Sequence, residues 1–416
     1  MADLDALLDT YAAVILKVGV NLQPGQTLSI GAPGAGVPIE TADFVRRVAA
    51  QAYASGAGDV LVEWGDPQLQ RVRLLSAPES ALEDIPEWKV QGTQALADRN
   101  AAFLILFAPS PDLMADVPPE RVARMQTAAA RAFHGFTDAM TKMRYAWSIA
   151  AVSTPTWARK VFADLPVEEA VARLWQCIFR GMRVEAPDPV QAWRDHLAQL
   201  DARADFMNRS HFARLHYVAP GTALTIDLPE RHVWMSAAHA VNAAGTSFVP
   251  NTPTEEIFTL PQRDGVNGVL RSTMPLNLNG VMVRNLRLTL ERGRIVDFGA
   301  DEGYEAIKHI IETDDGSHYL GEVALVPVGS PVDFGFPLFN TLFDENASCH
   351  VAIGKALPVC LEGGEQMSPE ELAAAGANDS LTHIDFMVGS PQLHIDGETA
   401  SGERVPVFRN GTWANS

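Results

Sequence analysis

The sequence is poor in cysteine, and its three cysteines are not grouped. Cys177, Cys349 and Cys360 are odd in number, and none belongs to a Cys-x-x-Cys pair. A disulfide framework and a cysteine-rich zinc site both need matched sets of cysteines, so both are disfavoured. This cysteine usage is typical of a reducing, intracellular compartment.

Basic residues and long apolar runs are also scarce. The chain has 32 Lys and Arg against 51 Asp and Glu, a net charge of −19, which disfavours binding to nucleic acids or anionic membranes. No apolar run approaches the roughly 20 residues of a membrane-spanning helix. The acidic start of the chain, Met-Ala-Asp-Leu-Asp, differs from the basic start of a signal peptide. We therefore expect a cytoplasmic protein without nucleic-acid or membrane partners, whose acidic clefts suit divalent cations and ammonium groups.

With 416 residues, the chain is too long for one ordinary domain. In the first half of the chain, strand patterns alternate with helix patterns. The strand patterns cover residues 27–30, 59–64, 101–108 and 145–152. The helix patterns cover residues 3–17, 41–54, 118–133, 168–182 and 188–208. The apolar run 101–108 is typical of a strand buried on both faces of a parallel sheet. After residue 210, hairpin patterns at 213–228 and 286–298 take over. We predict an α/β N-terminal domain over 1–210 and a mainly antiparallel β (α+β) C-terminal domain over 211–416.

A His-x-Asp pattern, His383-Ile384-Asp385, lies in a strand expected over residues 381–388. Alternate strand residues point to the same face, so His383 and Asp385 project together while Ile384 turns toward the core. A histidine and a carboxylate on one face form half of a site for Zn²⁺, Mn²⁺, Co²⁺ or Fe²⁺. The same pair is also common as a surface hydrogen bond, so the pattern alone is weak.

Five further candidates come from three other segments. Glu322 precedes the apolar run Val-Ala-Leu-Val and has no Lys or Arg within ten residues, so its burial would require a cation from elsewhere. His350 lies among small and apolar residues, where a core histidine bonded to a carbonyl is the alternative. Glu255 and Glu256 follow a proline turn and precede an apolar pair. Glu345 could bind metal, and the alternative is that it is an ordinary carboxylate in a loop.

The candidates are more informative as a set than one by one. Five or six oxygen and imidazole ligands, two of them histidines, are too many for a single four-coordinate zinc ion. They suit two metal ions about 3.5–4 Å apart that are bridged by a carboxylate and a water. The sequence therefore favours a two-metal site in the second half of the chain.

At these residues the chain resembles the M29 family of metallo-aminopeptidases, the thermophilic aminopeptidase family. The matching motifs are NTPTEEIFT (residues 251–259), YLGEVALV (319–326), NTLFDENASCH (340–350) and HIDFMVG (383–389). The resemblance implies a homodimer whose C-terminal domain is catalytic. It also implies an exopeptidase with two divalent ions (Zn, Co or Mn), which releases N-terminal amino acids from peptides with a free N-terminus through a metal-activated water.

Position by position, the resemblance implies a specific set of ligands. These metal ligands are Glu256, Glu322, His350, His383 and Asp385, with Glu345 as a further ligand or near neighbour. A free carboxylate would serve as general base, and Glu255 beside Glu256 is the candidate. If this segment is extended, however, neighbouring side chains point to opposite faces, which counts against Glu255.

The chain departs from the family pattern at one position. Many members have a tyrosine seven residues after the histidine of the third motif, and this chain has Leu357 there. A tyrosine hydroxyl could donate a hydrogen bond to the developing oxyanion. His232 and His239, in a polar loop before the first glutamate motif, are the candidates to replace it.

Two other functions stay open at this point. His350, His383 and Asp385 alone would make the facial triad of an iron-dependent ring-cleaving dioxygenase, although Glu256 and Glu322 favour two metals. A non-catalytic protein that keeps the metal site is the second alternative, and Leu357 is the feature that favours it. The number of metal ions per chain separates the first alternative from an aminopeptidase, and an assay on aminoacyl anilides separates the second.

Overall fold

The computed structural model describes residues 4–110, 112–114, 116–278 and 281–414. The chain forms two compact units. Unit 1 consists of residues 1–196 and 238–253, and unit 2 consists of residues 197–237 and 254–416. The helix α10 (Pro189–Ser210) contributes residues to both. The domain boundary at residue 210 that the sequence predicts stays a prediction.

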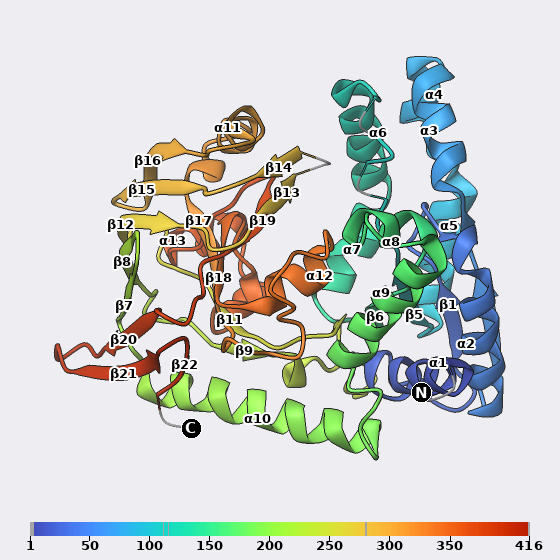
Figure 1. Ribbon diagram of the computed structural model, residues 1–416, viewed down its shortest axis with the longest axis horizontal. Coiled ribbons are helices and arrows are strands. Elements are labelled where there is room, and N and C mark those ends of the chain that lie inside the picture. Colours follow the sequence, from blue (N-terminus) through green and yellow to red (C-terminus); the bar gives the residue numbers. More distant parts are fainter. Residues whose placement is uncertain (1–3, 111, 115, 279–280, 415–416) are drawn as a thin grey trace. The chain divides into compact units, whose positions relative to one another are not determined.

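Unit 1 is built on a parallel sheet of five strands (Figure 1). The strand order is β10 (Asn251–Thr252), β6 (Trp147–Ala151), β5 (Ala102–Phe107), β1 (Thr27–Ile30) and β3 (Asp59–Val62). All pairings between these strands are parallel. The central strand β5 has the sequence AFLILF and is buried over most of its length, as its continuous apolar run predicts.

Nine helices of unit 1 lie among the described residues. They are α1 (Leu4–Val14), α2 (Ala42–Ala54), α3 (Pro67–Ser76), α4 (Glu79–Glu83), α5 (Glu87–Asp98), α6 (Pro119–Ala132), α7 (His134–Thr141), α8 (Pro155–Val161) and α9 (Val167–Gly181). A turn of π-helix over Ile15–Gly19 extends α1, and the short strands β2 (Val37–Pro38) and β4 (Trp64–Gly65) pair beside the sheet. Helices α1, α2 and α9 pack through an aromatic cluster of Tyr11, Phe44, Trp175 and Phe179.

Unit 2 contains two antiparallel sheets. The larger has eight strands in the order β16 (Arg294–Gly299), β15 (Arg287–Glu291), β12 (Val266–Arg271), β8 (Thr222–Asp227), β7 (Arg214–Ala219), β20 (His394–Glu398), β21 (Arg404–Arg409) and β22 (Thr412–Trp413). The smaller has five, in the order β19 (His383–Met387), β18 (His350–Gly354), β17 (Leu320–Leu325), β11 (Ile257–Thr259) and β9 (Met235–Ser236). A separate ribbon joins β13 (Leu276–Leu278) to β14 (Val281–Val283), and the helices are α11 (Tyr304–Ile311), α12 (Thr341–Asp344) and α13 (Pro369–Ala374).

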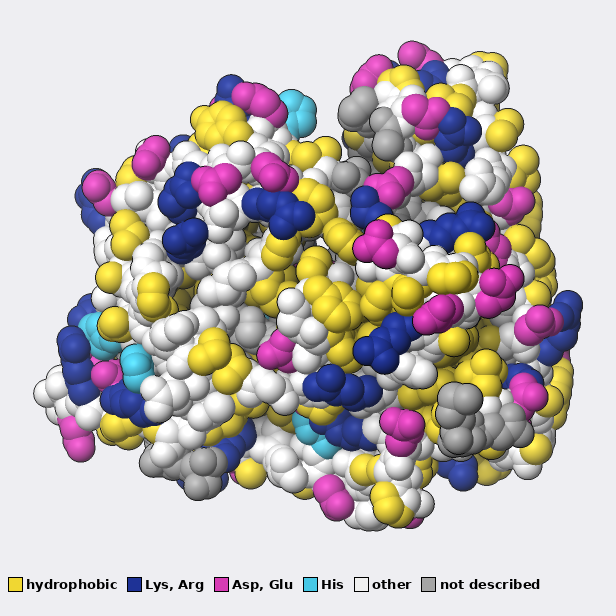
Figure 2. Space-filling model, in the orientation of Figure 1, with side chains coloured by type: hydrophobic (Ala, Val, Ile, Leu, Met, Phe, Trp, Pro, Cys, Tyr) yellow, Lys and Arg dark blue, Asp and Glu magenta, His cyan; other side chains and the backbone are white. Residues whose placement is uncertain are grey.

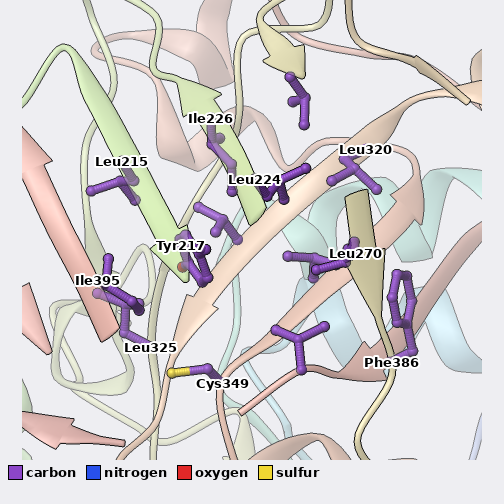
Figure 3. Packing of buried hydrophobic residues seen from close by; sticks show 14 of the residues in the cluster. Leu215, Tyr217, Leu224, Ile226, Leu270, Leu320, Leu325, Cys349, Phe386 and Ile395 are labelled. Carbon is purple, nitrogen blue, oxygen red and sulfur yellow. The ribbon is translucent and has the colours of Figure 1, made fainter. Parts of the chain in front are cut away.

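One face of the five-stranded sheet belongs to the hydrophobic core of unit 2. Figure 3 shows apolar side chains of β7 and β8, such as Leu215 and Ile226, packed with Leu325 and Phe386 from the smaller sheet. Val323, Leu325, Val351 and Ile353 are buried in this core. Alternation along the strands therefore leaves the intervening residues of β17, β18 and β19 on the opposite face.

The fold class predicted from the sequence is confirmed, with local differences. Both predicted hairpins of unit 2 form, as β7–β8 and β15–β16. Strand β17 begins at Leu320, two residues before Glu322. Helices α3, α4 and α5 were missed because α4 is short and the other two are only weakly amphipathic. The first predicted helix starts at a position, Asp3, that lies outside the described residues. Ser368 and Glu371 form a capping box at the start of α13, with Pro369 in its first turn.

Two further properties concern the whole chain. No helix in the described ranges is both long and apolar enough to cross a bilayer. On the face that Figure 2 shows, basic and acidic side chains are interspersed.

Candidate metal centre

A row of three residues crosses the five-stranded sheet of unit 2, on the face opposite the core. Glu322 on β17 pairs with Ala352 on β18, and Ala352 pairs with Asp385 on β19. All three side chains therefore project to one face. Because the middle residue carries only a methyl group, the space between the two carboxylates is not filled by a large side chain.

The two histidines flank this row on the same face. His350 stands two residues before Ala352 on β18, and His383 on β19 pairs with Gly354, two residues after Ala352. The predicted same-face relation of His383 and Asp385 follows from strand β19, while Ile384 packs against the core. The strand register thus gathers two imidazoles and two carboxylates around two small residues.

A third carboxylate arrives from the neighbouring strand. Glu256 immediately precedes β11, whose Phe258 pairs with Ala324, and Ala324 pairs with His350. Alternate positions share a face, which brings Glu256 to the face of His350. Its Oε2 atom lies 3.0 Å from Nε2 of His350.

These five side chains form two groups that share one residue. Ligand atoms of Glu256, Glu322 and His350 lie within 4.8 Å of one another, and so do those of Glu322, His383 and Asp385. Oε1 of Glu322 is 3.5 Å from Nε2 of His350, and its Oε2 is 3.7 Å from Nε2 of His383. In the second group, Nε2 of His383 is 3.4 Å from Oδ1 of Asp385. The two oxygens of Glu322 therefore face different groups, which is the arrangement of a bridging carboxylate.

Backbone carbonyls orient both imidazoles. Nδ1 of His350 lies 3.2 Å from the carbonyl oxygen of Ser348, and Nδ1 of His383 lies 2.7 Å from that of Lys355. A carbonyl only accepts hydrogen bonds, so Nδ1 carries a proton in each ring. In the neutral rings, Nε2 then points a lone pair at the carboxylates, which is the orientation of a metal-binding histidine.

The carboxylates of this cluster require positive charge. Burial raises the pKa of Glu322. Burial disfavours the charged form of His350, but the nearby carboxylates of Glu256 and Glu322 outweigh it and raise the pKa of His350 well above its ordinary value. The same balance, with Asp385 and Glu322 as partners, raises the pKa of His383 to about 10. Without a cation, protons on the imidazoles must therefore supply the charge that the carboxylates demand.

The donor atoms fit divalent metal ions. Within the described part of the chain, no hydrogen bond of good geometry reaches Oε2 of Glu256 or Oδ1 of Asp385, although both atoms are buried. Buried carboxylate oxygens of this kind are costly unless a cation or donor meets them. Mixed carboxylate and imidazole donors suit Zn²⁺, Mn²⁺ or Co²⁺.

Glu345 stands next to the cluster but in neither group. It begins a short 3₁₀ turn, Glu345–Ala347, after α12. Burial raises the pKa of Glu345 well above its ordinary value, and the negative charges of Asp385 and Glu256 add to the shift. The carboxyl group of Glu345 therefore interacts electrostatically with the cluster and can hold a proton beside it.

Glu255 is placed differently. Its backbone N–H donates to Oδ1 of Asn346 over 2.7 Å, and Nδ2 of Asn346 lies 3.4 Å from Oε1 of Glu345. The side chain of Glu255 is buried and belongs to neither group. Asn346 thus connects the segment of Glu256 to that of Glu345.

Leu357 belongs to an apolar wall beside the carboxylates. It packs against a cluster of Leu260, Ala356, Cys360, Leu361 and Ala377. Burial raises the pKa of Cys360 well above its ordinary value, with smaller contributions from the charges of Glu322 and Glu256, so this wall adjoins the cluster. His232 is buried, bonds Pro229 through Nδ1 and stacks on His211. The side chain of His239 lies outside the described residues.

Several residues that shape the site were missed by the sequence analysis. Ser348 and Lys355 act through backbone carbonyls, which carry no side-chain signal. Ala352 and Gly354 matter because they are small, and only the strand register shows that they lie between the histidines and carboxylates. Asn346 could have been suspected, because it follows Glu345 within the third motif.

The comparisons with known proteins agree with this chemistry. The family described as thermophilic metalloprotease (M29) matches residues 4–413. Aminopeptidase 2 of Geobacillus stearothermophilus is 48% identical over 408 residues, which cover 98% of this chain and 97% of that protein.

Two solved structures resemble the chain to different degrees. AmpT from Thermus thermophilus is 39% identical, with a TM-score of 0.92 over 99% of this chain and 100% of that one. A 2,5-dihydroxypyridine dioxygenase from Pseudomonas putida KT2440 reaches a TM-score of 0.52 over 99% of this chain and 97% of that one, at 11% identity. The second likeness concerns the fold alone.

Proposed function

The chain belongs to the M29 family of thermophilic metalloproteases, and on this premise we propose that it is a metal-dependent aminopeptidase. It would release N-terminal amino acids from peptides with a free N-terminus. The observation that carries the proposal is the pair of ligand groups that share Glu322. An acidic site of this kind also attracts the α-ammonium group of a peptide, which fixes the end at which cleavage occurs.

We propose that five side chains hold two divalent ions. Glu256, Glu322 and His350 would hold one ion, and Glu322, His383 and Asp385 the other, with Glu322 as the bridge. The ions, Zn²⁺, Co²⁺ or Mn²⁺, would lower the pKa of a bound water and polarise the scissile carbonyl. The carbonyl oxygens behind His350 and His383 keep the imidazoles oriented while this happens.

Proton transfer is assigned to a carboxylate outside the ligand set. We propose Glu345 as the general base, because it adjoins both groups and belongs to neither. It would accept a proton from the attacking water and return it to the leaving amine as the carbon–nitrogen bond breaks. Glu255 remains the second candidate, since it is buried next to Glu256.

The dioxygenase alternative would use His350, His383 and Asp385 with a single iron. Two observations support the aminopeptidase instead. Glu256 and Glu322 lie within the same cluster as the histidines, and the named aminopeptidase relative is 48% identical whereas the dioxygenase likeness is at 11% identity.

We further propose that the protein is a cytoplasmic homodimer. The dimer rests on the resemblance to the family. The location is supported by Cys177, Cys349 and Cys360, which are free and buried thiols of the kind that persists in reducing compartments. Light scattering on purified protein tests the dimer, since the mass of a single chain would contradict it.

A metal count combined with a peptidase assay tests the function. The protein is stripped with a chelator, titrated with Zn²⁺, Co²⁺ or Mn²⁺, and assayed on a panel of aminoacyl anilides and on the same compounds with a blocked amine. We expect two ions per chain, activity that returns with metal, and no cleavage of the blocked compounds. One ion per chain, or a metal-loaded protein inactive on every free-amine compound, would contradict the proposal.

A further inference from the structure

A buried asparagine holds the backbone that orients one of the two imidazoles. We infer that Asn378 is a positioning residue for His383 and acts through both peptide groups of Lys355. The inference rests on the proposed role of His383 as a metal ligand. It concerns a residue whose described hydrogen bonds do not reach the proposed ligand atoms.

The side chain of Asn378 is buried and its amide is fully engaged. Nδ2 donates to the carbonyl oxygens of Gly354 at 2.6 Å and Gly316 at 2.8 Å, and Oδ1 accepts from Nε of Arg263 at 3.0 Å. The two carbonyls can only accept and the guanidinium can only donate, so one orientation of the amide satisfies all three partners. An aspartate has the same shape but lacks the donor.

These contacts clamp the peptide groups on either side of Lys355. In the first peptide group, the carbonyl of Gly354 accepts from Nδ2 of Asn378, and the N–H of Lys355 donates to the carbonyl of Thr382 at 2.7 Å. In the second, the N–H of Ala356 donates to the backbone carbonyl of Asn378 at 2.8 Å. The remaining carbonyl, that of Lys355, is the group that faces Nδ1 of His383 at 2.7 Å. The side chain of Asn378 therefore holds the peptide group before this oxygen, and the backbone carbonyl of Asn378 holds the peptide group after it.

The backbone at this point tolerates little displacement. Gly354 has a φ of +108°, and a Cβ added there would lie 2.2 Å from the carbonyl oxygen of Thr382. Only glycine fits this conformation and this close approach. The strand end that carries the Lys355 carbonyl is thus packed against the segment that leads into His383.

An outer layer fixes Asn378 in turn. Nη2 of Arg263 lies 2.6 Å from Oδ2 of Asp315, and its guanidinium stacks over the ring of Tyr319 at 4.0 Å. A guanidinium held at both its edge and its face gives the Oδ1 atom of Asn378 a fixed donor. The chain of contacts runs from Arg263 through Asn378 and Lys355 to His383.

The network is one-sided, which makes the inference testable. The imidazole of His350 is oriented by the carbonyl of Ser348, whereas the hydrogen bonds of Asn378 that the structure describes go to Arg263, Gly316, Gly354 and Ala356. Loss of a group that orients a metal-binding histidine typically weakens metal binding about 10- to 100-fold. A variant at Asn378 should therefore weaken the binding of one of the two metal ions and leave the binding of the other unchanged.

The experiment compares metal binding in matched variants of the full chain. Asn378→Asp keeps the shape and removes the donor, and Asn378→Ala removes the side chain. Asn208→Ala is the control, because Asn208 also bonds backbone groups in unit 2, the N–H and carbonyl of Trp234. Calorimetric titration of the stripped proteins with Zn²⁺ measures both affinities, and thermal melting measures stability.

We expect both Asn378 variants to bind one ion as the wild type does and the other about 10- to 100-fold more weakly, while Asn208→Ala melts earlier with both affinities unchanged. In a His383→Ala background, Asn378→Asp should have no further effect on metal binding, because the group that it positions is gone. Folded Asn378 variants with two wild-type affinities would overturn the inference, as would equal weakening of both ions. A wild type that binds no Zn²⁺ would refute the proposed function instead.

Discussion

Strands β5 of unit 1 and β17 of unit 2 are both interior strands of their sheets, and both are largely buried. The residues of β5, AFLILF, are apolar on both faces. Those of β17, LGEVAL, are apolar on the core face and carry Glu322 on the other. The two strands are similarly buried but have different neighbours. Strand β5 contacts apolar groups on both faces, whereas β17 contacts imidazoles and carboxylates on one of its faces.

The two strands differ in the energetic consequence of burial. An apolar strand such as β5 gains stability from burial on both faces. A buried carboxylate such as Glu322 costs free energy unless it is matched by positive charge. We therefore expect substitutions in β5 to change stability and those on the polar face of the five-stranded sheet to change metal binding and turnover.

The largest effect is expected at the shared residue of the two ligand groups. Glu322→Gln keeps the shape of the side chain and removes the charge that both ions would share. Loss of several kcal/mol of charge stabilisation corresponds to at least about a thousandfold in kcat. Metal analysis and an anilide assay check this, with circular dichroism to show that the fold is kept. Full metal content and near-normal turnover in the variant would remove Glu322 from the ligand set.

The second effect separates ligands from the general base. Glu345→Gln should lower kcat by about 10²–10⁴-fold and leave two ions bound, because Glu345 belongs to neither ligand group. Glu255→Gln is measured in parallel. The reverse result, a loss of kcat in Glu255→Gln alone with metal retained, would assign the base to Glu255.

The third effect belongs to the apolar side of the comparison. Leu104 lies in β5, is fully buried and pairs with Ile30 and Ser148. Leu104→Ala should lower the free energy of unfolding by about 2–5 kcal/mol, because it leaves a cavity. Denaturant titration measures the loss, and metal content should not change. A Leu104 variant that loses metal before it loses stability would contradict the assignment of stability to β5 and of metal binding to β17.

The smallest effect contrasts two buried histidines of unit 2. Burial lowers the pKa of His232 to about 4, with its Pro229 bond opposing the shift and its neighbour His211 adding to it, whereas carboxylates raise that of His350. Below an ordinary pKa of about 6.5 the unfolded chain takes up a proton at His232 that the folded chain refuses, so stability is lost as the pH falls from about 6.5 toward 4. The loss is at most about 3–4 kcal/mol for a shift of this size.

Metal-free wild type and His232→Gln provide the measurement. Both are unfolded by denaturant at pH 7.5 and at pH 5, and the wild type should lose more stability between the two. Equal losses would show that His232 does not contribute to the pH dependence. Metal-free protein is used so that proton release from the ligands does not enter the comparison.

Much of the local structure could be predicted from the chain alone. The apolar run at 101–108 indicated the interior strand β5, and alternation placed His383 and Asp385 on one face with Ile384 on the other. Helices α3 to α5 were missed because weakly periodic helices depend on packing for their stability. The choice of general base between Glu255 and Glu345 depends on which carboxylate lies outside the ligand groups, and this is a property of the tertiary structure.

The residue types of the site, and the faces on which they lie within each strand, follow from local sequence, because side-chain alternation is a property of consecutive residues. The neighbourhood of β17, β18 and β19, the place of Ala352 between Glu322 and Asp385, and the contact of the Lys355 carbonyl with His383 follow from the folded chain. These relations join residues about 30 to 60 positions apart in the chain. No local pattern encodes them, since strand order and register follow from how the whole core packs.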